Sequence, residues 1–555
     1  MSLWSTIASK VKEVLLRMLG SKTVESALHV APVISTKMEN AINTWGRLYE
    51  NKAPWLQEPN EDNGFVRIVS LGLPSLIASE KARTALIEFK SEITTPTEEV
   101  EKENPNFGQP TNNITTPEGQ VVNISTDNRP TVTEDVPVSD TGRAEFLNEE
   151  YKKLLKKLRT QVEYGIAKGG LVIKPYVVRN ENDNEHPYDI EFDFIQADAF
   201  YPLAFDASGR ITEAAFLQSK TDKQFVYYRL EYHKWAGNKV TVINKAYKST
   251  IQESQNVNIQ DAQNLGKEIP LSEVPEWSAL QEETTIAPVE KPLFAYFKMP
   301  EANTVDITSP LGVSGFNRAI SLIKDADMQY SRLLWEYEAG EMAIDIDRDA
   351  LRKDDVDSPS KMPVMQQRLF RKVDLGASGD TYQPYAPALR DTSYSQGLNI
   401  ILMRIEDAVA LSRGTLSDAS SEARTATELK ILKQRSYQAN NDIQQSLEDT
   451  LRDVIYIMNV YCDLYQITPP GEYDASFEWD DSILVDVDTE LNKRLTLMQS
   501  GLMSKIELRQ WYFGETKRQA EEALAEIDNE NMQDMEQQLE MQASQQAMMP
   551  QPEEE

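Results

Sequence analysis

The chain has 555 residues, of which 40% are hydrophobic, and its 57 Lys and Arg residues are outnumbered by 89 Asp and Glu residues, giving a formal net charge of -32. A chain of this length can bury several cores, so we expect two to four structural units. So negative a charge excludes the counterion-release mechanism by which basic proteins bind nucleic acid, although it does not prevent nucleic acid from passing close by.

Cysteine and histidine are scarce, with one cysteine, Cys462, and three histidines, His29, His186 and His233. A disulfide framework within the chain is therefore excluded, and a Cys/His zinc site lacks ligands. No run approaches the ~18 apolar residues that a membrane span requires. We expect a protein that is not secreted and does not span a membrane.

The first 205 residues predict two ordered regions separated by a polar one. Residues 1–92 are expected to be mainly helical. Residues 93–140 are rich in Thr, Pro, Asn and Glu and have one aromatic residue. Such a segment cannot bury enough apolar area to offset its ordering entropy, so we expect a mobile insertion. Residues 141–205 predict a helix that ends at Gly169 and Gly170, followed by strands.

Residues 206–310 form the β-rich part of the chain. The sequence QFVYYRLEYHKWAGNKVTVINKAYK indicates a hairpin that turns at 236–238. The most regular helix follows over about 316–340, with one apolar stripe. After a turn-rich passage, three helices are expected over roughly 394–412, 422–445 and 446–466. Residues 490–548 read as almost wholly helical. The expected fold class is α+β, mainly α-helical.

The stretch AIDIDRDAL raises the question of a metal site, because it places Asp345, Asp347 and Asp349 at alternate positions. A calcium-binding EF-hand loop would require Gly and Glu at the sixth and twelfth positions, where this chain has Ala350 and Val356. The interleaved isoleucines instead match the period of a strand with one apolar and one acidic face. An acidic strand face is the simpler interpretation, and a metal site is the alternative.

Other catalytic patterns are incomplete. The sequence GVSG at 312–315 lacks the final Gly of a nucleophile elbow, and neither Walker nor GxGxxG spacing occurs. The acidic pairs in FEWDDSILVDVDTE are typical of helix capping and of soluble strand edges. The sequence therefore predicts no catalytic residue, metal ligand or cofactor.

Several motifs, read in order, together resemble one family. The passage FEWDDSILVDVDTELNKRLTLMQSGLMSKIELRQ resembles that family's acidic strand, helix and G-L-x-S helix start, followed by a Glu/Ala-rich helix. Its matching positions include Phe477, Asp480, Asp481, Asp486, Gly501, Leu502, Ser504, Glu521 and Glu522. The motifs NKAPWL, LPSLIASEKARTALIEF, SSEARTATELKILKQRS and EYGIAKGGLVIKPYV add to it, the last with Gly165, Gly169, Gly170 and Lys174. These stretches resemble the portal proteins of tailed double-stranded-DNA bacteriophages, in the branch found in long-tailed phages of Gram-positive bacteria.

The resemblance implies a ring, usually of twelve subunits, at one capsid vertex of the virion, assembled in the host cytoplasm. Double-stranded DNA would pass through its channel during packaging and ejection without sequence-specific binding. The implied partners are the major capsid protein, the scaffolding protein, the terminase large subunit and the head-tail adaptor, and the ring would nucleate procapsid assembly. The family is structural, so neither enzyme activity nor a cofactor is implied.

The family's wing, stem, clip and crown can be mapped onto the chain by analogy. The N-terminal helical part of the wing would be 1–92. The mobile polar insertion would follow at 93–140, and an α/β part of the wing at 141–205. The clip and the first stem element would lie in 206–310 and the second stem helix in 311–342. The wing would resume over 343–489, and the crown and acidic tail would be 490–555. A tunnel loop at 371–393 would form charged rings around DNA from Arg371, Lys372, Asp374, Asp380 and Arg390.

Two other classes of protein remain open from the residues alone. The aspartate clusters leave room for a metal-dependent nuclease or phosphatase. The polar helical C-terminus would also suit a scaffolding or minor head protein.

Overall fold

The computed structural model describes residues 27–28, 33–56, 68–87, 89–103, 113–115, 121–123, 131–137, 141–179, 187–222, 224–250, 265–347, 370–373, 382–418, 426–479, 487–514, 519–521, 523–525 and 527. Two compact units divide the chain, Met1–Trp479 and Asp480–Glu555. The mixed α+β class expected from the sequence is confirmed.

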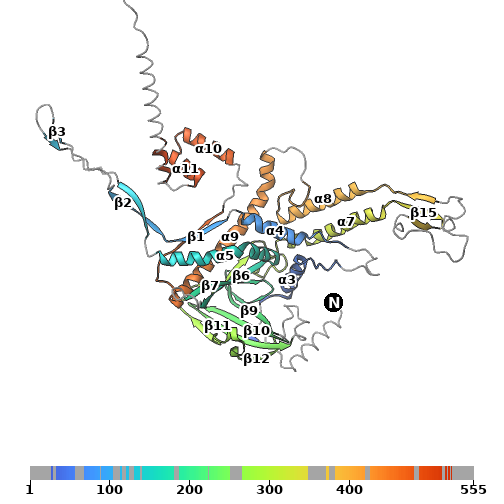
Figure 1. Cartoon of the computed structure of the whole chain (residues 1–555), viewed down its shortest axis with the longest axis horizontal. Coiled ribbons are helices and arrows are strands. Elements are labelled where there is room, and N and C mark those ends of the chain that lie inside the picture. Colours follow the sequence, from blue (N-terminus) through green and yellow to red (C-terminus); the bar gives the residue numbers. More distant parts are fainter. Residues whose placement is uncertain are drawn as a thin grey trace, which may run out of the picture. The chain divides into compact units, whose positions relative to one another are not determined.

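The described residues of the N-terminal part of the first unit include three helices (Figure 1): α3 (Thr36–Tyr49), α4 (Leu73–Ala85) and α5 (Gly142–Lys168). Ser35 begins α3 by accepting a hydrogen bond from the Met38 N–H at 3.3 Å. The apolar stripe of α5 is buried, and Gly169 ends the helix in the left-handed conformation with φ of 87°. The helix and its glycine end are as predicted.

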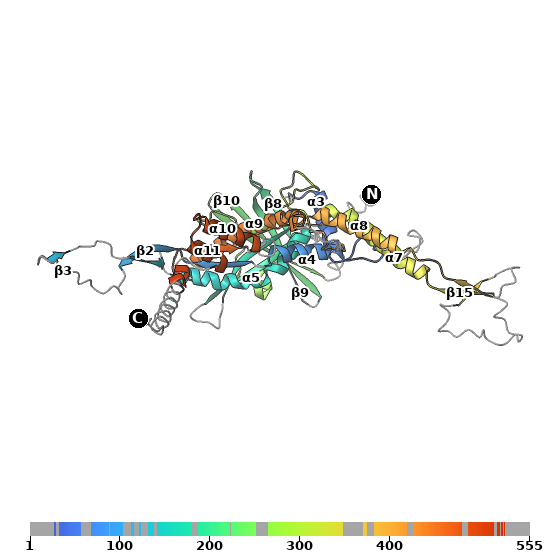
Figure 2. The same cartoon turned by 90° about the horizontal axis from the view of Figure 1, so that it is seen from above.

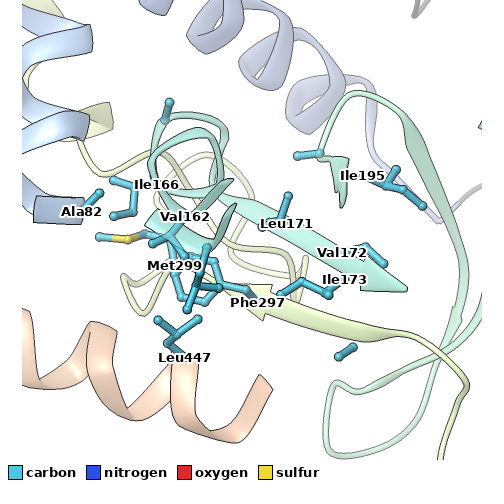
Figure 3. Close-up of a cluster of buried hydrophobic side chains, with 14 of the residues drawn as sticks. Ala82, Val162, Ile166, Leu171, Val172, Ile173, Ile195, Phe297, Met299 and Leu447 are labelled. Atoms are coloured by element: carbon cyan, nitrogen blue, oxygen red, sulfur yellow. The ribbon is translucent and has the colours of Figure 1, made fainter. Parts of the chain in front are cut away.

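A three-stranded antiparallel sheet lies at the centre of the main core. Its order is β14 (Ala295–Lys298), β6 (Gly170–Arg179) and β7 (Tyr188–Gln196). Figure 3 shows side chains from α4, α5, β6 and β14 meeting those of a long later helix: Ala82, Val162, Ile166, Leu171, Phe297, Met299 and Leu447. All of these side chains are buried. Burial on both sides explains why β6 reads as a continuous apolar run instead of an alternating one.

The β-rich part forms a six-stranded sheet. Strands β8 (Phe200–Phe205), β9 (Ile211–Asp222), β10 (Phe225–Ala236), β11 (Lys239–Thr250) and β12 (Lys267–Ile269) follow one another, and β13 (Glu283–Ile286) also pairs with β11. The register places Ala236 opposite Lys239. The predicted hairpin is therefore confirmed, with Gly237 and Asn238 as its two turn residues.

Residues 90–137 contain paired strands. Strand β1 (Lys90–Thr94) pairs with β18 (Asp474–Glu478), far away in sequence. Strands β2 (Thr97–Glu103) and β5 (Thr131–Pro137) form an antiparallel ribbon, and β3 (Asn113–Thr115) pairs with β4 (Val121–Asn123). The polar insertion at 93–140 thus includes strand pairing, which its composition did not suggest.

A pair of helices brackets a small sheet. Helix α7 (Ile320–Ala339) precedes β15 (Ala343–Asp347), β16 (Phe370–Val373) and β17 (Tyr382–Tyr385), and helix α8 (Asp391–Val409) follows. Strand β15 lies between the other two, parallel to β16 and antiparallel to β17. The predictions of a helix near 316–340 and of a strand at AIDID are both confirmed.

The next helix, α9, runs without interruption from Ala426 to Tyr465. The predicted division into two helices at 445 and 446 is therefore wrong. Buried side chains continue at helical spacing through that point, at Ile443, Leu447, Leu451, Val454 and Met458. No Gly or Pro occurs between 426 and 465 to end the helix.

The second unit contains α10 (Val487–Gln499) and α11 (Lys505–Phe513). Gly501 has φ of 75°, and Ser504 begins α11 with a capping box in which its side chain and that of Glu507 each accept a backbone N–H. The predicted helix start at G-L-x-S is confirmed. Within the described residues of both units, none of the helices combines the length and apolarity needed to cross a membrane.

Candidate functional site

Helices α7 and α8 lie side by side and antiparallel, with β15 at their far end (Figures 1 and 2). In both views this end is remote from α5 and β9. Helix α7 therefore leaves the core, the chain turns through the small sheet, and α8 returns. We consider this helix pair and its attachments as the candidate site.

One ion pair fastens the two helices next to the small sheet. Arg390, immediately before α8, donates from Nε and Nη2 to Glu336 Oε1 and Oε2 at 3.1 and 2.7 Å, and its backbone N–H donates to the same Oε1 at 3.1 Å. These hydrogen bonds from Arg390 hold the pKa of Glu336 below its usual value. The bidentate geometry fixes the start of α8 against the last turn of α7.

The middle of α7 is anchored through a buried carboxylate. Asp327 accepts the indole N–H of Trp55 at 2.9 Å and the backbone N–H of Leu71 at 2.8 Å. One turn further on, Ser331 Oγ accepts the N–H of Val69 at 2.8 Å. Burial raises the pKa of Asp327 although both hydrogen bonds act to lower it. The motif NKAPWL thus contributes a tryptophan that holds the helix from 272 residues away.

A close crossing of two glycines supports the base of α7. An added Cβ at Gly169 would lie 2.7 Å from the Gly312 carbonyl oxygen, and one at Gly312 would lie 2.1 Å from the Gly169 oxygen. Around this crossing Gly169 O accepts the Met299 N–H at 3.2 Å, and Ile166 O accepts the Gly315 N–H at 2.9 Å. GVSG at 312–315 is therefore a packing element.

The neighbouring motif glycines have a similar role. A Cβ at Gly170 would meet the Tyr296 hydroxyl at 2.4 Å, and one at Gly165 would meet the Phe297 ring at 3.0 Å. Lys174 of the same motif is buried and pairs with Glu231 of the six-stranded sheet at 2.7 Å. These positions hold together the core on which α7 stands.

The connection from α8 to α9 begins with a turn built around Glu406. The fully buried Oε1 of this residue accepts the N–H groups of Gly414, Leu416 and Ser417 at 3.2, 2.6 and 2.9 Å, and its Oε2 accepts the Ser417 hydroxyl at 2.8 Å. A single carboxylate therefore fixes the backbone of 414–417.

The five predicted tunnel-loop residues separate into three groups. Arg371 and Lys372 are in β16, where the register sets them beside Asp345 and Ile346 of β15. Arg390 is bound to Glu336 at the start of α8, and Asp374 and Asp380 lie outside the described residues. The structure thus brings three of the five to the small sheet and the start of α8.

Large apolar side chains are exposed on and beside the helix pair. Trp335 of α7 is 58% exposed and Ile400 of α8 is 54% exposed, and others are Tyr337, Met342, Tyr385 and Leu389. Patches of this kind mark surfaces that meet another protein. Sequence reasoning counted Tyr337 in the apolar stripe of this helix, where the structure leaves it 45% exposed, and it did not single out Trp335.

The C-terminal motif positions are only partly described. Phe477 is in β18, and the Arg452 guanidinium stacks over its ring at 4.6 Å. Gly501 and Ser504 form the turn and the capping box before α11. Asp480, Asp481 and Asp486 lie outside the described residues. In the part of the chain that is described, no three His, Cys, Asp or Glu side chains group as metal ligands.

Comparison with known proteins decides the family. Residues 41–545 match the model of the phage portal protein family, SPP1 Gp6-like. The chain belongs to this portal protein family. No curated protein matches the chain.

Family membership resolves the open alternatives. Portal proteins are structural components of the phage virion without enzyme activity, so this portal family member is neither a nuclease nor a phosphatase, and the scaffolding alternative also fails. The order of NKAPWL, the glycine motif and the C-terminal motif was the signal that found the family. The structural roles of Trp55, Gly169 and Ser504 explain why those motifs mattered.

Proposed function

We propose that the chain is the subunit of a portal ring at one capsid vertex, through which double-stranded DNA is packaged and later ejected. In this proposal α7 and α8 form the stem around the channel. The observation that carries it is the exposed apolar surface on an antiparallel helix pair, because such a surface needs cover and a neighbouring copy of the same chain can supply it.

The three-stranded sheet β15–β16–β17 is proposed as the clip. It follows one stem helix and precedes the other, whereas in the 206–310 region strands β9 to β13 are built into the six-stranded sheet and β14 into the sheet of β6 and β7. We therefore assign the clip to the small sheet in preference to 206–310. The terminase large subunit and then the head-tail adaptor would dock there, and Arg371, Lys372 and Arg390 would lie in or beside this clip.

The remaining parts follow the family's plan. The core around the β6 sheet would be the wing, and α10 and α11 the start of the crown. The major capsid protein and the scaffolding protein would contact the ring during procapsid assembly. A net charge of -32 per chain supports low friction between the channel wall and DNA. Each phosphate that Lys or Arg neutralises adds binding free energy, which DNA would have to overcome in order to slide.

Electron microscopy of the purified chain tests the proposal. We expect rings with a central hole, and we expect Trp335→Asp to abolish them while the melting temperature of the subunit is unchanged, because Trp335 is already half exposed. Ile307→Asp is the matched control, since Ile307 is 89% exposed and lies outside the helix pair. Monomers of the wild-type chain at every concentration, or intact rings in Trp335→Asp, would contradict it.

A further inference from the structure

Three arginines from different elements meet at one residue, Asp407, where α8 ends. Arg413, in the connection after α8, donates from Nε and Nη2 to Asp407 Oδ1 and Oδ2 at 3.2 and 2.8 Å. Arg404 of α8 has Nη1 3.9 Å from Asp407 Oδ2, and Arg435 of α9 donates from Nη1 to the Asp407 carbonyl oxygen at 3.3 Å. Three guanidinium groups thus surround one residue.

The cluster is exposed and held in place. Arg404 and Arg413 are 69% and 41% exposed, and Arg435 is exposed as well. The neighbouring carboxylate, Glu406, is buried and bound to the loop N–H groups, so it fixes the backbone next to Arg413. Asp407 is the carboxylate that pairs with these arginines.

Three guanidinium groups against the two carboxylates Asp407 and Glu406 leave a local excess of one positive charge in a chain of net charge -32, and this excess points to an anionic partner. The guanidinium fork that grips the two oxygens of Asp407 fits two phosphate oxygens equally well. A phosphate can therefore compete with the Asp407 carboxylate for these guanidinium groups.

We propose that Arg404, Arg413 and Arg435 contact the phosphate backbone of duplex DNA, and that Asp407 competes with the phosphates so that each contact stays weak and exchangeable. The proposal rests on the proposed portal function and adds to it a site and a role for one acid. Asp407 recaptures Arg413 when a phosphate leaves, which lowers the barrier to sliding.

The competition has a consequence that a purely structural ion pair lacks. Removing Asp407 should strengthen DNA binding, because the arginines then have no internal acceptor of the same shape. If the pair only braced the α8–α9 connection, its removal would leave DNA binding unchanged or weaken it. An acidic partner protein at this surface would likewise leave DNA binding unchanged.

The test is fluorescence anisotropy of a 30-base-pair duplex with the full-length assembled protein between 50 and 200 mM NaCl, conditions chosen to bracket screening of phosphate contacts. Asp407→Asn should tighten binding roughly two- to fivefold, the strength of an exposed ion pair. The triple variant Arg404→Gln, Arg413→Gln and Arg435→Gln should weaken it and flatten the salt dependence by about one unit of slope for each phosphate that is no longer neutralised. Arg83→Gln, at an exposed arginine paired with Glu80 on α4, should behave as wild type.

Failure of this inference is distinguishable from failure of the portal function. Rings that bind DNA equally well in wild type, Asp407→Asn and the triple variant would overturn the inference and leave the portal function intact. A wild-type chain that forms no rings would overturn the portal function itself. If Asp407→Asn lowers the melting temperature, the double variant Arg404→Gln and Arg435→Gln is measured instead, because it leaves the Asp407–Arg413 pair in place. An unchanged affinity of this double variant for DNA would count against the inference.

Discussion

Lys174 Nζ lies 2.7 Å from Glu231 Oε2, and these two buried side chains join the three-stranded sheet to the six-stranded one. Arg229 Nη2 reaches the same Oε2 at 2.9 Å, and His233 Nε2 lies 2.7 Å from Oε1. Burial acts to raise the pKa of Glu231, but Lys174, His233 and Arg229 together hold it well below its usual value. One carboxylate therefore pairs with the buried Lys174 and the partly buried Arg229.

The variant Glu231→Gln should be severely destabilised, because it removes the carboxylate 2.7 Å from the buried Lys174 and leaves this cation with the more distant Asp193, at 3.9 Å. Breaking a buried pair in this way costs about 3–5 kcal/mol. Thermal melting of the purified chain measures the loss. The control is Glu276→Gln, which removes an exposed partner of Lys220 and should leave the melting temperature unchanged. Equal melting temperatures for the two variants would show that Glu231 is not required between the sheets.

His233 should make the same region sensitive to mild acid. Burial lowers its pKa below the ordinary value of 6.5, Lys174 and Arg229 lower it further, and Glu231 acts in the opposite direction. Tyr461 is the other titratable group that faces the Glu231 carboxylate. The unfolded chain therefore takes up a proton near pH 6.5 while the folded chain does not, so stability falls as the pH drops from 6.5 to the folded pKa.

Melting at pH 7.5 and pH 5.5, chosen on either side of that value, checks this prediction. The wild type should lose more stability between the two than His233→Gln, which keeps a donor for Glu231 but does not titrate. His29 and His186 are present in both proteins and cancel in the comparison. Identical pH dependence in the two proteins would exclude His233 as the cause.

Local patterns predicted much of this fold. Helix α7, the turn at 236–238 and the strand at AIDID each depend on residues close together in sequence, and each is confirmed. The apolar stripe of α7 is only partly buried, because Tyr337 is exposed. The break wrongly placed at 445 and 446 shows the limit, because only the buried series through Leu447 and Leu451 reveals that α9 continues.

Long-range partners were not predictable. The pairing of β1 with β18 joins residues such as Ser91 and Phe477. Gly169 faces Gly312, and Lys174 faces Glu231, and in neither case does the sequence near one residue indicate the other. The arginine cluster around Asp407 was missed for the same reason. In the sequence, Arg404, Arg413 and Arg435 look like ordinary surface residues, and only the fold brings them to Asp407.

The glycine crossing gives a sharp test of packing. Gly169→Ala should cost about 3–5 kcal/mol, because φ of 87° strains an L residue and the new Cβ would lie 2.7 Å from a backbone oxygen. Gly237→Ala is matched in φ, at 66°, but a Cβ there meets nothing within 4 Å, so only about 1 kcal/mol is expected. Melting temperatures of the two variants measure the difference. Similar losses would mean that strain alone, and not the crossing with Gly312, accounts for the glycine.

Glu406→Gln should loosen the turn after α8 without unfolding the protein. The amide oxygen can keep the place of Oε1, but it carries no charge, so the hydrogen bonds from the Gly414, Leu416 and Ser417 N–H groups are weaker. The NH₂ group in the place of Oε2 cannot accept the Ser417 hydroxyl, so about 1–3 kcal/mol of local stability is lost. Amide hydrogen exchange at Leu416 and Ser417 should accelerate, while exchange in the buried middle of α9 stays slow. Asp418→Asn is the control, because Asp418 is held beside this turn by its backbone N–H, which donates to Asn399 Oδ1 at 2.8 Å and is kept in the variant. Unchanged exchange in Glu406→Gln would mean that the α8–α9 connection is held by its flanking helices, and that the carboxylate does not set the position of Arg413.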